Sequence, residues 1–123
     1  MFLYEWWNAI PELITQLCQL PHDHAGDMET SMILTINPSL VKKDKYAEAS
    51  ATNVTTWGKM LHGVPVALDT IDFTKTGNVG DPSYATAEKG RKLLDASAEH
   101  LHLFCKWLSE EPEESLKPKP HVA

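Results

Sequence analysis

The chain alternates between segments in which apolar residues recur with a helical period and segments without such a period. In the central segment apolar residues lie three and four positions apart, so that one face of a helix can turn inward. These residues are Met28, Met32, Ile33, Leu34 and Ile36. If Gly26 is the N-cap, Glu29 is the third helical residue, where its carboxylate complements the helix dipole and can reach back to the cap. The pattern therefore predicts a core helix after Gly26, with His24 just outside it and free to point into a cleft.

Two further helices are predicted, one on each side of the central helix. The first has an apolar stripe within residues 10–20, and Pro21 is its stop signal. The second begins at about Ser83 or Thr86 and ends at Pro112, with apolar residues four and three positions apart. These residues are Leu94, Ala98, Leu101, Cys105 and Leu108.

Strands are expected to be few and short. The aromatic stretch 2–7 suits the end of a buried strand, where Trp6 and Trp7 would face a cleft. Two adjacent tryptophans that simply cover the core would explain the same pattern. The run 64–73 is β-like, but Pro65 cannot donate to a ladder, which places it at an edge or at the first residue of the run. The polar segment before this run, residues 46–59, shows no sustained period and is expected to be a loop with one helical turn.

Length, charge and cysteine content limit the possible classes of protein. A chain of 123 residues is long enough for one small domain. It has 17 acidic against 11 basic residues, and the basic ones form no stripe, so nucleic acid is not an expected partner. No apolar run approaches the roughly 20 residues that cross a bilayer, and the first residues lack the features of a signal peptide, so we expect a cytoplasmic protein without a membrane partner. The cysteines, Cys18 and Cys105, are expected to be reduced core thiols.

Candidate chemistry is concentrated in two loops. His22 and His24 could offer two imidazoles on one side of an extended segment, but a catalytic zinc usually takes three protein ligands. Spacing alone therefore favours surface or cap histidines over metal ligands. In the second loop, residues 76–82, Gly77 and Gly80 permit positive φ and a close backbone approach to a ligand. A plain connecting loop would have the same composition.

Two blocks of sequence carry a resemblance to a known family. The run His24-Ala-Gly-Asp-Met-Glu-Thr-Ser-Met-Ile-Leu34, followed by Asn37-Pro-Ser-Leu-Val41, resembles the creatininase family of metal-dependent hydrolases. The later run 74–82 and the residues 85–90 after it resemble the family's later loop and the start of its last helix. The likeness covers most of this chain but only the C-terminal half of the family's domain. It implies an α/β fold, the C-terminal part of a three-layer α/β/α domain over residues 1–111, helix-rich with few short strands, and a flexible tail over residues 112–123.

The resemblance also implies an activity. Family members hydrolyse small amides or related carbonyl compounds with a dinuclear metal centre, usually Zn²⁺ or Mn²⁺. Here it implies cleavage of a C–N bond in a small cyclic amide or formamide, with His24 as the catalytic proton shuttle and Glu29 supporting it or the metal. The residues expected to contact substrate are Trp6, Trp7, Thr76, Gly77, Gly80 and Asp81. The family's main metal ligands lie in its N-terminal half, and no position of this chain matches them.

Other interpretations of the same residues stay open. The chain is expected either to be an active homo-oligomer or to be an inactive fragment or subunit whose N-terminal half another chain supplies. A hydrolase of a cyclic inositol-derived ketone and a helical interaction module are further possibilities. Creatinine itself is not the expected substrate, because Leu20-Pro21 stands where members that act on creatinine carry a Trp-Asp pair.

Overall fold

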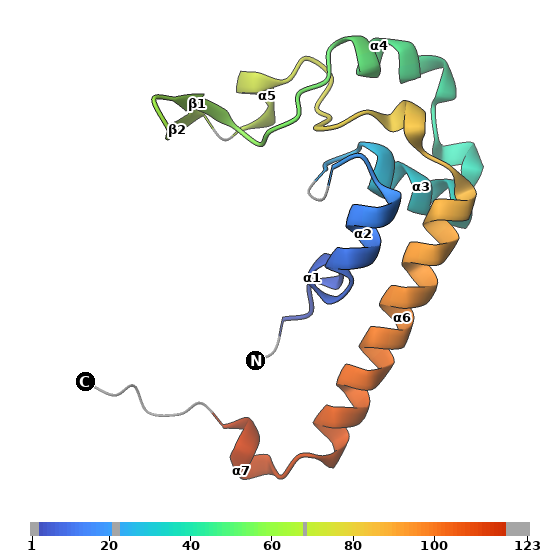
Figure 1. Ribbon diagram of the computed structural model, residues 1–123, viewed down its shortest axis with the longest axis vertical. Coiled ribbons are helices and arrows are strands. Elements are labelled where there is room, and N and C mark those ends of the chain that lie inside the picture. Colours follow the sequence, from blue (N-terminus) through green and yellow to red (C-terminus); the bar gives the residue numbers. More distant parts are fainter. Residues whose placement is uncertain (1–2, 21–22, 68, 118–123) are drawn as a thin grey trace.

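Helices dominate the structure (Figure 1), a computed structural model that describes residues 3–20, 23–67 and 69–117. The α-helices are α1 (Trp6–Ala9), α2 (Pro11–Leu17), α3 (Asp27–Ile36), α4 (Tyr46–Ala51), α5 (Thr70–Phe73), α6 (Ala87–Glu110) and α7 (Glu113–Leu116). Short 3-10 turns are η1 (Pro38–Leu40), η2 (Lys43–Lys45) and η3 (Pro82–Tyr84), and the strands are β1 (Lys59–Leu61) and β2 (Val64–Ala67). The expectation of a helix-rich chain with few short strands is confirmed and is compatible with the α/β class.

The core lies where α2 and α6 pack against α3. Its buried apolar residues are Ile10, Ile14, Met28 and Leu93, and Trp6, Leu13 and Met32 pack against them. Burying each of the larger side chains stabilises the fold by about 1.5–3 kcal/mol. At Gly90 the two longest helices come so close that a Cβ would clash with the backbone carbonyl of Ser31. Thr35 strengthens this crossing, because its hydroxyl donates to the Ala87 carbonyl at 2.7 Å.

The three predicted helices are confirmed, with one difference in length. The side chain of Thr86 accepts the Lys89 N–H at 3.2 Å, which sets the start of α6 at the later of the two expected positions. Helix α2 ends at Leu17 rather than at residue 20. The reason is that the N–H of Gln19 donates to the Asp27 carboxylate at 3.1 Å instead of continuing the helix.

The strand expected at residues 2–7 is wrong within the described part of that stretch. Residues Trp6–Ala9 form the helical turn α1, whose Trp6 packs against the core cluster. Aromatic residues favour strands only where a neighbouring strand accepts them, and the described sheet consists of β1 and β2 alone. The aromatic side chain of Trp6 is therefore covered by the helical core and not by a neighbouring strand.

The β-like run 64–73 divides into β2 and the short helix α5. Strand β2 pairs antiparallel with β1, which sequence reasoning did not expect, and Pro65 lies opposite Met60. His62 and Gly63 have φ of 49° and 80°, as a tight hairpin turn requires. Both strands of a two-stranded sheet are edges, so the edge position expected for Pro65 is confirmed. The predicted loop 46–59 contains its one expected helical element, α4, and the first residue of β1.

The C-terminal half of α6 extends away from α3, and α7 lies at its far end (Figure 1). Here Cys105 is exposed, so its expected place in the core is wrong, whereas Cys18 at the end of α2 is half-buried. Large apolar side chains stay exposed on this half and on the hairpin: Leu101, Leu103, Trp107, Met60, Leu61, Val64 and Val66. Within the expected tail, α7 forms a helical turn, and residues 118–123 lie outside the described residues. None of the described helices combines the length and apolar character needed to span a membrane.

Candidate active site

His24 is held by backbone pairing at the entrance to α3. Its N–H donates to the Val79 carbonyl at 2.9 Å, and its carbonyl accepts the Val79 N–H at 2.8 Å. On the other side of the same segment, the Gly80 N–H donates to the Val54 carbonyl at 2.7 Å. The fully buried Val79 therefore joins three segments that are far apart in sequence. This pairing brings the loop after α5 against the loop that carries His24.

Glu29 faces the imidazole of His24. Its Oε2 lies 3.7 Å from the imidazole Nδ1, and the two side chains are 50% and 43% exposed. The same oxygen accepts the Ala25 N–H at 2.8 Å. The expected reach of Glu29 back over the helix start is therefore present, one residue earlier than the N-cap Gly26. A carboxylate in this position can orient the imidazole and stabilise its protonated form.

Gly26 is the N-cap of α3, as expected, and Asp23 adds a side-chain cap from outside the helix. Its Oδ2 accepts the Met28 N–H at 2.7 Å, while its Oδ1 is buried and has no hydrogen-bond partner among the described residues. Burial raises the pKa of Asp23 to about 6; the Met28 hydrogen bond opposes this shift, and the charge of Glu29 adds to it. An aspartate shortly before a helix is a recognisable capping signal. Sequence reasoning did not assign this role to Asp23, because it considered Gly26 as the N-cap.

Trp57 provides an aromatic contact that sequence reasoning missed. Its ring centroid lies 5.6 Å from that of His24, with the two planes nearly perpendicular at 86°. Phe73 of α5 also contacts the indole of Trp57, with the two ring centroids 5.5 Å apart. Trp57 is 50% exposed, so it can present its face to a ligand beside the imidazole. The polar segment around Trp57 has no periodic pattern that would predict where this residue lies. Its place beside His24 follows from the pairing of Val54 with Val79 in the folded chain.

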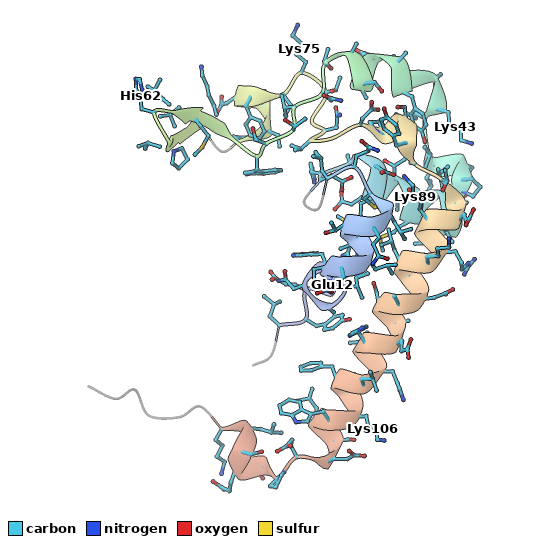
Figure 2. The ribbon with its side chains drawn as sticks, viewed as in Figure 1. Glu12, Lys43, His62, Lys75, Lys89 and Lys106 are labelled. Atoms are coloured by element: carbon cyan, nitrogen blue, oxygen red, sulfur yellow. The ribbon has the colours of Figure 1, made fainter. Side chains whose placement is uncertain are left out.

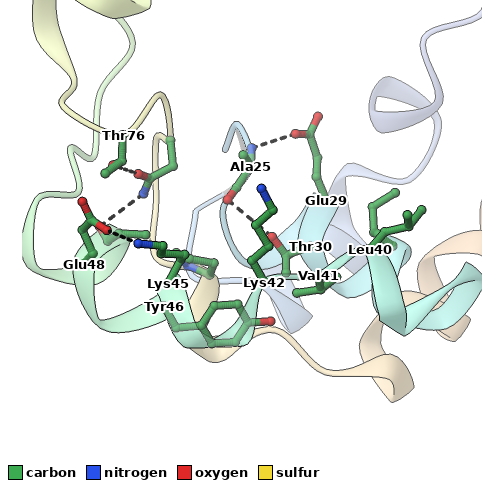
Figure 3. Close-up of a pocket in the computed structure, with 14 residues that line it drawn as sticks. Ala25, Glu29, Thr30, Leu40, Val41, Lys42, Lys45, Tyr46, Glu48 and Thr76 are labelled. Carbon is green, nitrogen blue, oxygen red and sulfur yellow. Dashed lines mark hydrogen bonds and ion pairs between the residues drawn. The ribbon is translucent and has the colours of Figure 1, made fainter.

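A cavity of about 480 Å³ opens beside Glu29 (Figure 3). It is enclosed by α3, η1, α4 and the loop after α5, and this volume suits a small-molecule ligand. Its lining residues are Ala25, Glu29, Thr30, Ile33, Leu40, Val41, Lys42, Lys45, Tyr46, Glu48, Ala49, Thr76, Asn78 and Pro82. His24 does not line the cavity itself but borders it through Glu29 and Ala25.

The structure places the expected loop residues in two different surroundings. Thr76 lines the cavity, and its hydroxyl hydrogen-bonds to the side chain of Asn78. Gly77 has φ of 83° and open space beside its Cα. Gly80 and Asp81 instead line a smaller hollow of about 240 Å³ on another side of the loop. Asp81 is engaged structurally there, because its Oδ1 accepts the Ser83 N–H at 2.9 Å and caps η3.

The expected tryptophans lie on α1 and not at the cavity. Trp6 packs against the core cluster and contacts the ring of Trp7 edge-on at a centroid distance of 5.9 Å. Neither residue is among those that line the cavity. Their contact with a substrate therefore stays a prediction, while Trp57 is the described tryptophan that contacts His24.

The described residues do not fit a dinuclear metal centre by themselves. Within them, no group of three or more His, Cys, Asp and Glu side chains gathers in a way that could hold a metal ion. His24 and Glu29 form a pair, and the nearby carboxylate of Asp23 is directed at the Met28 N–H. His22, the second histidine of the extended segment, lies outside the described residues.

Comparison with known proteins indicates a family for this chain. A family model described as creatininase, creatinine amidohydrolase, matches residues 2–105. The matched region contains His24, Glu29, the cavity and both sequence blocks. Neither the curated proteins nor the solved structures gave a significant match.

Proposed function

The chain belongs to the creatininase family, and from this premise we propose that it is a metal-dependent hydrolase of a C–N bond in a small cyclic amide or formamide. Family membership indicates an amidohydrolase-type function in general. The observation that carries the finer proposal is the imidazole of His24, 3.7 Å from the Glu29 carboxylate at the edge of a cavity of small-molecule size. Such a pair can hold and move a proton next to a bound ligand.

In this proposal His24 delivers a proton to the leaving nitrogen. Breaking an amide C–N bond without that proton would release an amide anion, which is a very poor leaving group. Glu29 orients the imidazole and stabilises its charged form, while its bond from the Ala25 N–H fixes the carboxylate. Trp57 contacts the imidazole of His24 edge-to-face, with the ring centroids 5.6 Å apart. Both groups that touch the imidazole are therefore held by separate parts of the fold.

The proposal includes a metal and further polypeptide. The family is generally metal-dependent, and we assign Zn²⁺ or Mn²⁺, in a dinuclear centre, to the active form. We also propose that the described residues form part of a three-layer α/β/α domain in a homo-oligomer, or in a complex with a chain that carries the N-terminal half. Exposed apolar side chains on α6 and on the hairpin support association, because surfaces of this kind usually mark contacts with other polypeptides.

A substrate panel tests the proposal. The purified chain, with Zn²⁺ or Mn²⁺ added, is incubated with small cyclic amides, formamides and a cyclic inositol-derived ketone, and product release is followed by mass spectrometry. We expect turnover of an amide or a formamide that His24→Ala abolishes and that His62→Ala, in the exposed hairpin turn, leaves unchanged. Cleavage of the ketone alone would favour the alternative hydrolase. A folded chain that cleaves none of these compounds would favour an inactive subunit.

A further inference from the structure

Among the described residues that line the cavity beside Glu29, one cationic side chain, that of Lys42, has no counter-charge. Lys45 and Glu48 neutralise each other, with Nζ and Oε2 3.4 Å apart. Glu29 faces His24 and accepts the Ala25 N–H. The side chain of Lys42 has neither an ion pair nor a hydrogen bond within the part of the chain that the structure describes, while its backbone carbonyl accepts the Lys45 N–H at 2.9 Å. Figure 3 shows its side chain extended along the cavity toward Ala25.

Most of the remaining lining is apolar. The apolar side chains are Ala25, Ile33, Leu40, Val41, Tyr46, Ala49 and Pro82. Leu40 is 65% exposed and Ile33 is 38% exposed, so a ligand in the cavity would cover apolar surface that now faces water. This surface suits the apolar body of a small molecule rather than a chain of charged groups.

Tyr46 also lines this cavity. Its hydroxyl is buried and makes no hydrogen bond within the described residues, a state that is costly for a polar atom. Burial also raises the pKa of Tyr46, so the hydroxyl stays neutral and adds no charge to the lining.

We propose that the cavity binds a small molecule with an apolar body and a single carboxylate, and that Lys42 pairs with this carboxylate. The single positive charge of Lys42 can pair with one carboxylate of a ligand. The carboxylate of Glu29, which also lines the cavity, repels a second negative group of the ligand and can accept a hydrogen bond from an amide N–H. The inference rests on the proposed function and narrows it, because it makes the substrate an amide that carries a carboxylate.

Binding of two matched probes tests the inference without any turnover. N-benzoylglycine has an aromatic body, an amide and a carboxylate, and N-benzoylglycinamide differs only in having an uncharged amide at that end. Isothermal titration gives the Kd of each for the unmodified chain. We expect the carboxylate to bind about five- to tenfold tighter, and this ratio to shrink as salt is added. Equal affinities, or binding of neither probe by the folded chain, would overturn the inference.

Variants assign the preference to one side chain. Lys42→Met is expected to bring the ratio of the two Kd values close to one, while Lys42→Arg keeps most of it. Lys43→Met is the matched control, because Lys43 is exposed on η2 and does not line the cavity. A ratio that survives in Lys42→Met would overturn the inference. Hydrolysis without carboxylate preference would refute only this inference, and carboxylate preference without hydrolysis would refute only the proposed function.

Discussion

The ammonium of Lys89 lies 2.9 Å from Oδ2 and 3.0 Å from Oδ1 of Asp27. This ion pair joins α6 to the first turn of α3, and Figure 2 marks Lys89 at the junction of the two helices. Asp27 is only 1% exposed and Lys89 is 22% exposed. The pair therefore connects the two sequence blocks of the family through the interior and fixes the helix that carries Glu29.

Removing the cation of this pair is expected to destabilise the fold strongly. Lys89→Met leaves the buried Asp27 carboxylate without its counter-charge, which should lower the free energy of unfolding by about 3 kcal/mol. Urea denaturation followed by circular dichroism measures the change. Lys92→Met is the control, since Lys92 pairs with Glu88 on the exposed face of the same helix and should leave stability nearly unchanged. Equal effects of the two variants would contradict the structural role of Asp27.

Asp23 should make stability depend on pH. Its pKa of about 6 in the folded chain exceeds the ordinary value of 3.8, so the folded chain binds the proton more tightly than the unfolded chain. The resulting stabilisation is complete below about pH 4 and is lost as the pH rises through about 6. Asp23→Asn should remove this loss, which we put at about 1 kcal/mol because solvent screens the partly exposed group.

Denaturation midpoints of the unmodified chain and of Asp23→Asn, measured from about pH 4 to about pH 7, give the difference between them. The variant should gain stability relative to the unmodified chain as the pH rises, since an asparagine oxygen can still accept the Met28 N–H. Asp95→Asn, at an exposed position on α6, controls for the general loss of a negative charge. A gap between Asp23→Asn and the unmodified chain that widens toward low pH would contradict the assignment.

The two cysteines should differ in reactivity. Burial, assisted by the charge of Asp27, raises the pKa of Cys18 to about 11, and little of it is thiolate near neutral pH. Cys105 is exposed on α6. A thiol-specific disulfide reagent should therefore modify Cys105 quickly in the native chain and Cys18 only after unfolding. The Cys105→Ser variant should lose the fast phase, and a fast phase that remained would show that Cys18 is accessible.

Two tryptophans can be compared as candidate substrate contacts. Trp57 contacts His24 in the structure, whereas Trp7 is the residue expected from the sequence. Trp57→Ala removes the ring 5.6 Å from the imidazole and should lower kcat/KM for the best amide about tenfold. Trp7→Ala, on α1, should leave kcat/KM within about twofold of the unmodified chain if only residues near His24 contribute. A loss with Trp7→Ala and none with Trp57→Ala would favour the sequence expectation.

The parts of the fold that the sequence predicts are those determined by local pattern. Helix α3 follows from its apolar period, and the start of α6 follows from the capping residue Thr86. The strand expected at residues 2–7 is wrong within its described part, because aromatic residues also suit a helical turn that packs on a core. The end of α2 depends on Asp27, a residue nine positions beyond Cys18 in the chain, and no local pattern reports that contact.

The candidate site shows the same division between local and tertiary information. His24 and Glu29 could be chosen from one short block, and the structure places them together. The contribution of Trp57 depends on the pairing of Val79 with both His24 and Val54, which brings a patternless segment to the imidazole. The unpaired Lys42 is likewise visible only once the partners of the other charged residues in the cavity are known.

In the proposed hydrolysis the imidazole of His24 transfers the proton to the leaving nitrogen. Measuring kcat/KM of the unmodified chain, His24→Ala and the control His62→Ala on the best amide of the panel tests this role. We expect a loss of about 10²- to 10⁴-fold for His24→Ala, with His62→Ala unchanged. Equal kcat/KM for His24→Ala and the unmodified chain would contradict this role.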